Sequence, residues 1–220
     1  MYGERVPRRH QLVWLARGWE EHVVSIAAEA APHVAAWVAR GLPLVATRQD
    51  PSCPGAVALG LARPPGSRVR RIAVRVTPAA LDRSAPPPRL SDALASAPAA
   101  WRAPLRALDL EARDAGLVLR VHGSLAWQHL SGEPYLSPSS DVDLLVRSRD
   151  PAALARALEL LGRHGAGPPR LDGELLLPGG RAVAWRELAG GGARVLVKTA
   201  DAVALVPRAR VEAAFREAVP

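Results

Sequence analysis

The chain has 220 residues, of which 49% are apolar, and a mean hydropathy near zero (+0.02). This is globular composition with enough length for one large domain or two small ones. No run of about 18 apolar residues is present, so no membrane-spanning helix is predicted, and the first ten residues lack the apolar stretch of a signal peptide. The single cysteine, Cys53, excludes an internal disulfide and has no metal-ligand spacing around it. We expect a cytoplasmic protein with no membrane partner.

The net charge of +8 predicts acidic partners, such as nucleic acid, a polyphosphate or an acidic protein surface. A soluble protein of arginine-rich composition would show the same charge. The basic residues are scattered along the chain, which does not favour nucleic-acid binding. Of the 29 basic residues only Lys198 is a lysine, and its compact ammonium suits a phosphate in a way that arginine does not. Lys198 is therefore a candidate phosphate-binding residue, with a solvated strand residue as the alternative.

The N-terminal part is predicted to combine a helix with strands. Residues 19–40 have apolar positions near a 3.6-residue period, with a kink expected at Pro32 and an end at Gly41. Three β-rich runs follow at 42–48, 56–62 and 69–76, and the last alternates as a strand with one exposed face.

A stiff linker is predicted at residues 83–90, which contain three consecutive prolines. We therefore place a smaller α/β domain over residues 1–85 and a second domain over residues 86–220.

The second domain is predicted to alternate strands with helices. Asp150 followed by Pro151 is typical of a helix start, and Pro178-Gly179-Gly180 is typical of a hairpin turn. The predicted helices are 101–112, 125–130, 151–164 and 206–219, and the predicted strands are 117–122, 141–146, 171–177, 181–187 and 194–199. This succession indicates an α/β unit.

Two short motifs in this domain indicate chemistry. Asp141 and Asp143 lie at the start of a strand and face the same way, because side chains alternate along a strand. Two such carboxylates repel each other unless a cation lies between them, and oxygen ligands of this kind suit magnesium. Gly123 allows a tight turn after the preceding strand, and Ser124 starts a helix whose free amides favour a phosphate. Each motif alone is more often a strand end or a turn, but their order and the helix between them favour a functional site.

A glycine-serine pair followed by Asp-x-Asp resembles the polymerase-β-type nucleotidyltransferase superfamily, although the sixteen residues between Ser124 and Asp141 exceed its tighter spacings. The longer string from Gly123 to Leu145 is more similar to one branch, the malonate decarboxylase holo-acyl-carrier-protein synthase family, also called phosphoribosyl-dephospho-CoA transferase. Residues 9–15, 171–174 and 182–187 also resemble that family. The resemblance implies a nucleotidyltransferase-fold C-terminal domain with a mixed sheet and flanking helices.

The resemblance also implies a reaction. A serine hydroxyl on the apo acyl carrier protein of malonate decarboxylase attacks the α-phosphate of triphosphoribosyl-dephospho-CoA, and diphosphate leaves. Asp141 and Asp143 would bind Mg²⁺, while Gly123, Ser124 and Lys198 would bind substrate phosphates. A third carboxylate would help to activate the hydroxyl. Asp172 is the first choice, with Glu174 on the same strand face and Glu187 on the expected hairpin partner as alternatives.

Two other functions remain open at this stage. A nucleotidyltransferase that adenylylates another protein or a small molecule would share the short motifs, and only the longer string argues against it. A nucleic-acid-binding module that had kept the fold would lack the carboxylates and cluster its basic residues, which this sequence does not do.

Overall fold

The computed structural model describes residues 6–216 and divides into two compact units. The first runs to Pro87 and includes Glu133–Tyr135, and the second comprises Pro88–Gly132 and the chain from Leu136 onward. The observed division thus falls two residues beyond the predicted end of the first domain. Both units combine helices with a six-stranded sheet, as predicted for the fold class. In the described part of the chain, no helix has the length and apolar character needed to cross a membrane.

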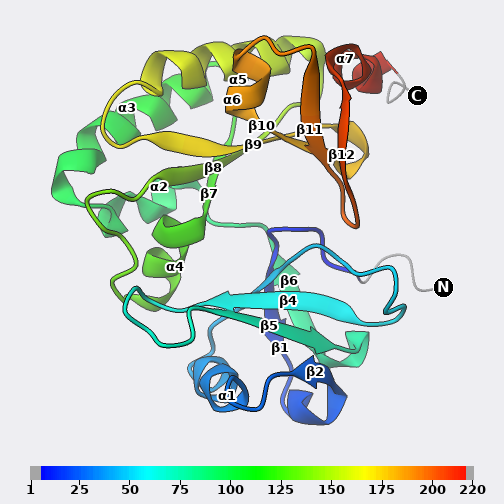
Figure 1. Cartoon of the computed structure of the whole chain (residues 1–220). Helices are drawn as coiled ribbons and strands as arrows, with labels where there is room; N and C mark the ends of the chain where they lie inside the picture. The colour runs from blue at the N-terminus through cyan, green and yellow to red at the C-terminus, as the bar shows by residue number, and fades with distance from the viewer. Residues whose placement is uncertain (1–5, 217–220) are drawn as a thin grey trace. The chain divides into compact units, whose positions relative to one another are not determined.

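The first unit is an antiparallel sheet in the order β2-β5-β4-β3-β1-β6, with one α-helix (Figure 1). Its elements are β1 (Leu12–Leu15), β2 (Val23–Ile26), α1 (Ala31–Ala39), β3 (Leu44–Ala46), β4 (Val57–Ala62), β5 (Arg71–Val76) and β6 (Leu81–Ala85). The three strands predicted from 42 to 76 are confirmed. In β5, Ile72, Val74 and Val76 are buried while Arg71 and Ala73 are exposed, as the alternation predicted.

Two predictions for this unit are wrong in part. Residues 19–30 are not helical, because Trp19–His22 forms a 3-10 turn and the β-branched run Val23–Ile26 pairs with β5. Pro32 lies in the first turn of α1, where its missing N–H costs nothing, and so begins the helix instead of kinking a longer one. The expected linker also starts later, because residues 83–85 belong to β6 and pair with β1.

The loop after Gly132 contributes three residues to the first unit. The Tyr135 hydroxyl donates to the Ala62 carbonyl oxygen at 2.9 Å, and Glu133 forms an ion pair with Arg40. Part of the chain between Ser124 and Asp141 therefore packs within the first unit.

The second unit holds a mixed sheet in the order β12-β11-β10-β9-β8-β7. Its elements are α2 (Leu90–Ala93), α3 (Ala99–Asp114), β7 (Leu119–His122), α4 (Gly123–Ser131), β8 (Val142–Arg147), α5 (Pro151–His164), β9 (Leu171–Leu176), β10 (Ala182–Ala184), α6 (Trp185–Ala189), β11 (Arg194–Lys198), β12 (Val203–Pro207) and α7 (Arg208–Arg216). Strands β8 and β9 pair in parallel through the α5 crossover, and the other neighbours are antiparallel.

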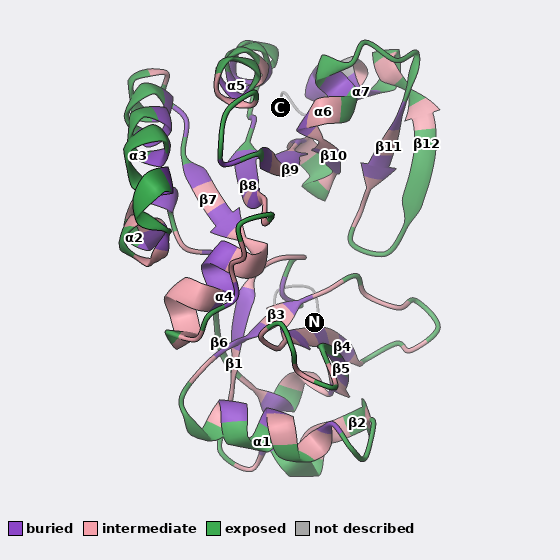
Figure 2. Cartoon of the chain, turned by 60° about the vertical axis from the view of Figure 1, so that its left-hand side comes forward, coloured by how far each residue is buried: buried purple, intermediate pink, exposed green. Residues whose placement is uncertain are grey.

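One face of this sheet is apolar and supplies the core of the unit, which Figure 2 shows as buried segments of β7, β8 and β9. Val121, Val142, Leu144 and residues of α2, α3, α5 and α6 belong to one buried cluster. The alternate positions of the same strands face the other way and include most of the charged residues of the sheet: Arg120, Asp143, Arg147, Asp172, Glu174 and Lys198. The sheet therefore separates a packed face from a polar one.

Most predicted elements of this unit are confirmed, including the Asp150 N-cap, whose carboxylate accepts from the Ala153 amide at 2.7 Å. The strand predicted at 181–187 is wrong beyond residue 184, because Trp185 begins α6 and Glu187 lies on that helix. The helix predicted from 206 starts at Arg208 after a strand, β12, that the sequence analysis missed. Its predicted end, residues 217–219, lies outside the described residues.

Gly173 fixes how closely β9 approaches β8, and its replacement should destabilise the fold. Its φ is +130°, and a Cβ there would lie 1.9 Å from the Leu144 carbonyl oxygen. We expect Gly173→Ala to lower the free energy of unfolding by about 3 kcal/mol or more, measured by urea denaturation. Gly162 on α5 has open space around it, so Gly162→Ala should instead stabilise the protein by about 0.5–1 kcal/mol. Equal stability of the two variants would contradict this account.

Candidate active site

Gly123 forms the turn between β7 and α4 and lies directly against a carboxylate. Its φ is +62°, in the left-handed region that glycine adopts without strain, and a Cβ at this position would lie 2.0 Å from Asp143 Oδ2. The antiparallel register pairs His122 with Asp143, which brings the turn and the carboxylate together. The glycine is therefore required both for the turn and for the space that the Asp143 side chain occupies.

Ser124 lies in the first turn of α4, a nine-residue helix that ends at Gly132 in the left-handed conformation. His122 precedes the helix in an extended conformation and makes no capping hydrogen bond. The first backbone amides of α4 have no partner within the helix, and they carry its positive dipole end. Gly123 and Ser124 thus lie where an anion is electrostatically favoured, beside the Asp143 carboxylate.

Asp143 and Asp172 are lateral neighbours on the two parallel strands β8 and β9. Burial, followed by the charges of Asp172, Asp141 and Glu174, raises the pKa of Asp143 to about 6. One Asp172 oxygen accepts from the Gly173 amide at 2.8 Å. Two carboxylates that lie side by side on neighbouring strands repel each other unless a proton or a cation lies between them. The charges of Asp143 and Asp172 therefore repel each other in the folded protein.

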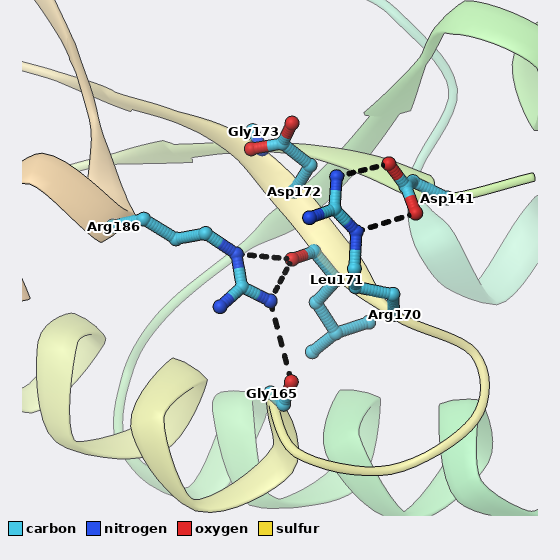
Figure 3. A network of polar contacts seen from close by, with 7 residues as sticks. All are labelled: Asp141, Gly165, Arg170, Leu171, Asp172, Gly173 and Arg186. Atoms are coloured by element: carbon cyan, nitrogen blue, oxygen red, sulfur yellow. Dashed lines mark hydrogen bonds and ion pairs between the residues drawn. The ribbon is translucent and has the colours of Figure 1, made fainter.

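Asp141 and Arg170 form the preceding lateral pair, one residue before Val142 and Leu171 (Figure 3). Arg170 Nε donates to Asp141 Oδ1 at 2.7 Å and Nη2 donates to Oδ2 at 2.5 Å. These hydrogen bonds hold the pKa of Asp141 below its usual value. Both Asp141 oxygens are therefore occupied by one guanidinium, whereas Asp143 contacts the glycine turn.

A second arginine fixes the segment that carries Arg170. Arg186 Nη2 donates to the carbonyl oxygens of Leu171 at 2.8 Å and Gly165 at 3.3 Å (Figure 3). Arg186 also lies over the Trp185 ring, at 4.5 Å from its centroid. The Arg170 carbonyl accepts from the Val142 amide at 2.9 Å. The backbone on both sides of the Arg170 side chain is thus held in place before that side chain contacts Asp141.

Of the other predicted carboxylates, Glu174 is buried and Glu187 is turned to the backbone. Glu174 lies two residues from Asp172 and forms an ion pair with Lys198 at 2.8 Å. The Glu187 carboxylate accepts from the Leu196 amide at 2.7 Å. Lys198 is therefore a partly exposed residue with an ion-pair partner, and it lies on the same sheet face as Asp172.

The donor set suits a hard divalent cation in its chemistry, because the Asp141 and Asp143 carboxylates lie at the start of β8 and Asp172 is the lateral neighbour of Asp143. Between residues 6 and 216, however, no three side chains of His, Cys, Asp or Glu are arranged as they stand to hold a metal ion. In the structure, the oxygens of Asp141 are bound by Arg170.

The sequence analysis did not identify Arg170 or Arg186. Both are single arginines in an arginine-rich chain, so residue type gave no signal. Only Arg170 had a positional signal, since it immediately precedes the strand that carries Asp172.

Comparison with known proteins gives consistent matches over nearly the whole chain. The N-terminal domain model of the phosphoribosyl-dephospho-CoA transferase MdcG matches residues 8–87, and the C-terminal domain model of the same family matches residues 89–209. No solved structure matches the chain.

Several curated relatives carry the name phosphoribosyl-dephospho-CoA transferase. One from Xanthomonas campestris pv. campestris (strain 8004) is 40% identical over 202 residues, which cover 91% of this chain and 94% of the relative. One from Bradyrhizobium diazoefficiens is 36% identical over 212 residues, covering 94% and 93%, and one from Azotobacter vinelandii is 36% identical over 209 residues, covering 91% and 93%. With both domain models matched in order and these relatives aligned over more than nine-tenths of both chains, this chain belongs to the phosphoribosyl-dephospho-CoA transferase family and is a transferase.

Proposed function

We propose that the protein transfers the phosphoribosyl-dephospho-CoA group from triphosphoribosyl-dephospho-CoA to a serine of the apo acyl carrier protein of malonate decarboxylase. The serine oxygen forms a bond to the α-phosphorus, the bond from that phosphorus to the bridging oxygen breaks, and diphosphate leaves. The observation that carries the proposal is the Asp143 carboxylate, which lies against the Gly123 turn and beside Asp172.

Asp141 and Asp143 are the residues that we propose to hold Mg²⁺, with Asp141 joining once its two oxygens are released from Arg170. When bound, this ion would neutralise the charge that develops on the phosphates and align the nucleophile with the leaving group. The repulsion between Asp143 and its neighbours supports this assignment, because a cation between the carboxylates would relieve it.

Asp172 is our choice for the carboxylate that receives the proton of the attacking serine. It is the direct lateral neighbour of Asp143, whereas Glu174 is already paired with Lys198 and Glu187 accepts a backbone amide. A base must lie within hydrogen-bonding reach of the proton that it takes, and only Asp172 shares the register position of the proposed metal ligand.

Gly123, Ser124 and Lys198 are proposed to contact the phosphates that leave as diphosphate. The start of α4 supplies backbone amides and the Ser124 hydroxyl. Lys198 lies on the same sheet face, and its pair with Glu174 leaves further ammonium protons for a phosphate. The net charge of +8 also favours association with an acyl carrier protein, since such proteins are typically acidic.

The transfer is tested by incubating the protein with Mg²⁺, triphosphoribosyl-dephospho-CoA and the apo carrier protein, and measuring the intact mass of the carrier. We expect one carrier to gain one prosthetic group, and a carrier whose acceptor serine is replaced by alanine to gain none. If the carrier keeps its mass while ATP labels another acceptor, the protein is a different nucleotidyltransferase and this proposal is wrong.

Replacing Asp143 or Asp172 with the isosteric amide should remove transfer without unfolding the protein. We expect Asp143→Asn and Asp172→Asn each to lower kcat/KM by about 100-fold or more, because each removes a charge used only at the reacting phosphate. The rate of carrier modification measures the effect. Asp82→Asn, at an exposed position on β6, is the matched control and should keep wild-type activity. Comparable activity in all three variants would contradict the assignment.

The raised pKa of Asp143 predicts a pH-dependent stability difference. With a folded pKa of about 6 against an ordinary 3.8, the folded state binds more protons than the unfolded state between these values, so stability falls as pH rises through that window. In protein freed of metal by a chelator, Asp143→Asn should therefore be more stable than wild type at pH 7 by up to about 3 kcal/mol. Below pH 4 the two should be equal.

Thermal unfolding at a series of pH values measures this difference, with Asp82→Asn as the control of equal charge change. Added Mg²⁺ should raise the midpoint of the wild-type protein more than that of Asp143→Asn, because only the wild type offers both carboxylates. A wild-type protein more stable than Asp143→Asn at pH 7 without metal would show that the Asp143 charge is already compensated.

A further inference from the structure

The contact between Asp141 and Arg170 is a two-point contact between one guanidinium and one carboxylate. The guanidinium meets both carboxylate oxygens with two parallel hydrogen bonds, at 2.7 and 2.5 Å. The Arg170 side chain is 59% exposed and that of Asp141 is 28% exposed, so the pair is in contact with solvent. The guanidinium is therefore both well oriented toward Asp141 and accessible to a second anion.

The two lateral pairs at the start of β8 and β9 differ in charge. Asp141 with Arg170 is neutral, whereas Asp143 with Asp172 carries two negative charges. The positive charge of Arg170 also acts on Asp143, where it opposes the repulsion from the neighbouring carboxylates. Arg170 is thus the cation nearest to the proposed metal ligands in the described part of the chain, and it occupies the oxygens that a metal ion would need.

We propose that Arg170 is a positioning residue that exchanges partners, releasing Asp141 when metal and triphosphate arrive and binding the triphosphate instead. This inference rests on the proposed function. An arginine that fits a carboxylate with two parallel hydrogen bonds fits two phosphate oxygens equally well. When a divalent cation binds Asp141 in place of Arg170, the guanidinium no longer has its carboxylate partner. It then lies beside the triphosphate, to which its positive charge is attracted.

The surrounding structure supports an exchange of the side chain alone. The Arg170 carbonyl is bonded to the Val142 amide, and Arg186 holds the next carbonyl, that of Leu171. The backbone is fixed while the long side chain is largely in solvent, so a rotation of the side chain moves the guanidinium without disturbing the sheet. Arg186, in contrast, donates to backbone carbonyl oxygens and stacks on the Trp185 ring. Of the two arginines, Arg186 is therefore the one whose side chain is held in place.

The exchange predicts that one variant, Arg170→Gln, binds Mn²⁺ more tightly and triphosphate more weakly than the wild type. Arg170→Gln removes the competitor for Asp141, so Mn²⁺ alone, followed by its electron paramagnetic resonance signal, should bind about tenfold more tightly than to wild type. The same variant should bind inorganic triphosphate in the presence of saturating Mn²⁺ about tenfold more weakly, because a charge-assisted two-point contact is lost. In the transfer reaction, KM for the triphosphoribosyl substrate should rise with a smaller change in kcat.

Two further variants complete the experiment. Arg163→Gln removes an arginine of similar exposure that pairs with Glu111 and Glu159 on the helices, and it should change neither affinity. Arg170→Lys keeps the charge but not the two-point geometry, and it should still bind triphosphate more weakly than wild type. This variant also tests the proposal if Arg170→Gln fails to fold.

Each outcome decides between the proposals. Unchanged or weaker Mn²⁺ binding in Arg170→Gln, or unchanged triphosphate binding in both variants, would overturn the exchange while leaving the transferase proposal intact if the wild-type protein still modifies the carrier. A wild-type protein that binds no Mn²⁺ with or without triphosphate would overturn both.

Discussion

The parallel pairing of β8 with β9 is the constraint on which the proposed site depends. A parallel register places equivalent positions of two strands side by side. Asp141 therefore lies beside Arg170 just before the strands begin, and Asp143 lies beside Asp172 two positions later. The first of these pairs joins opposite charges, and the second joins like charges. The second pair is unfavourable for folding, since burial and neighbouring charge raise the pKa of Asp143. Such strain is typical of sites that are completed by a ligand.

The glycines around this pair are necessary because backbone and side chains approach closely. Gly123 leaves space for the Asp143 carboxylate, and Gly173 allows β9 to lie against the Leu144 backbone. The apolar face of the same sheet is fully packed, so the polar face can concentrate charge without losing the core. The second unit thus combines a packed apolar face of the sheet with a polar face on which like charges repel each other.

The two arginines near the site have different roles that follow from their partners. Arg186 donates to backbone carbonyls and stacks on an indole, contacts that fix the chain between α5 and β9. Arg170 donates only to a carboxylate, in the residues described, and its side chain is mostly exposed. Under the exchange that we propose, Arg186 would keep the backbone fixed while the side chain of Arg170 moves between two partners.

The sequence by itself determined the periodic elements and the order of the two motifs. The α3 stripe, the Asp150 cap of α5 and the helix from Gly123 to the Gly132 stop are local features, fixed by residues within a few positions of one another. The strand at residues 23–26, the early end of β10 and the added strand β12 were missed because short segments adopt the conformation that their sheet partners impose. Sequence placed Asp141 and Asp143 on one face, but it could not show that Arg170 occupies one carboxylate while Gly123 abuts the other. Those contacts join residues about 20 to 30 positions apart, and only the register between strands, set by the packing of the whole sheet, brings them together.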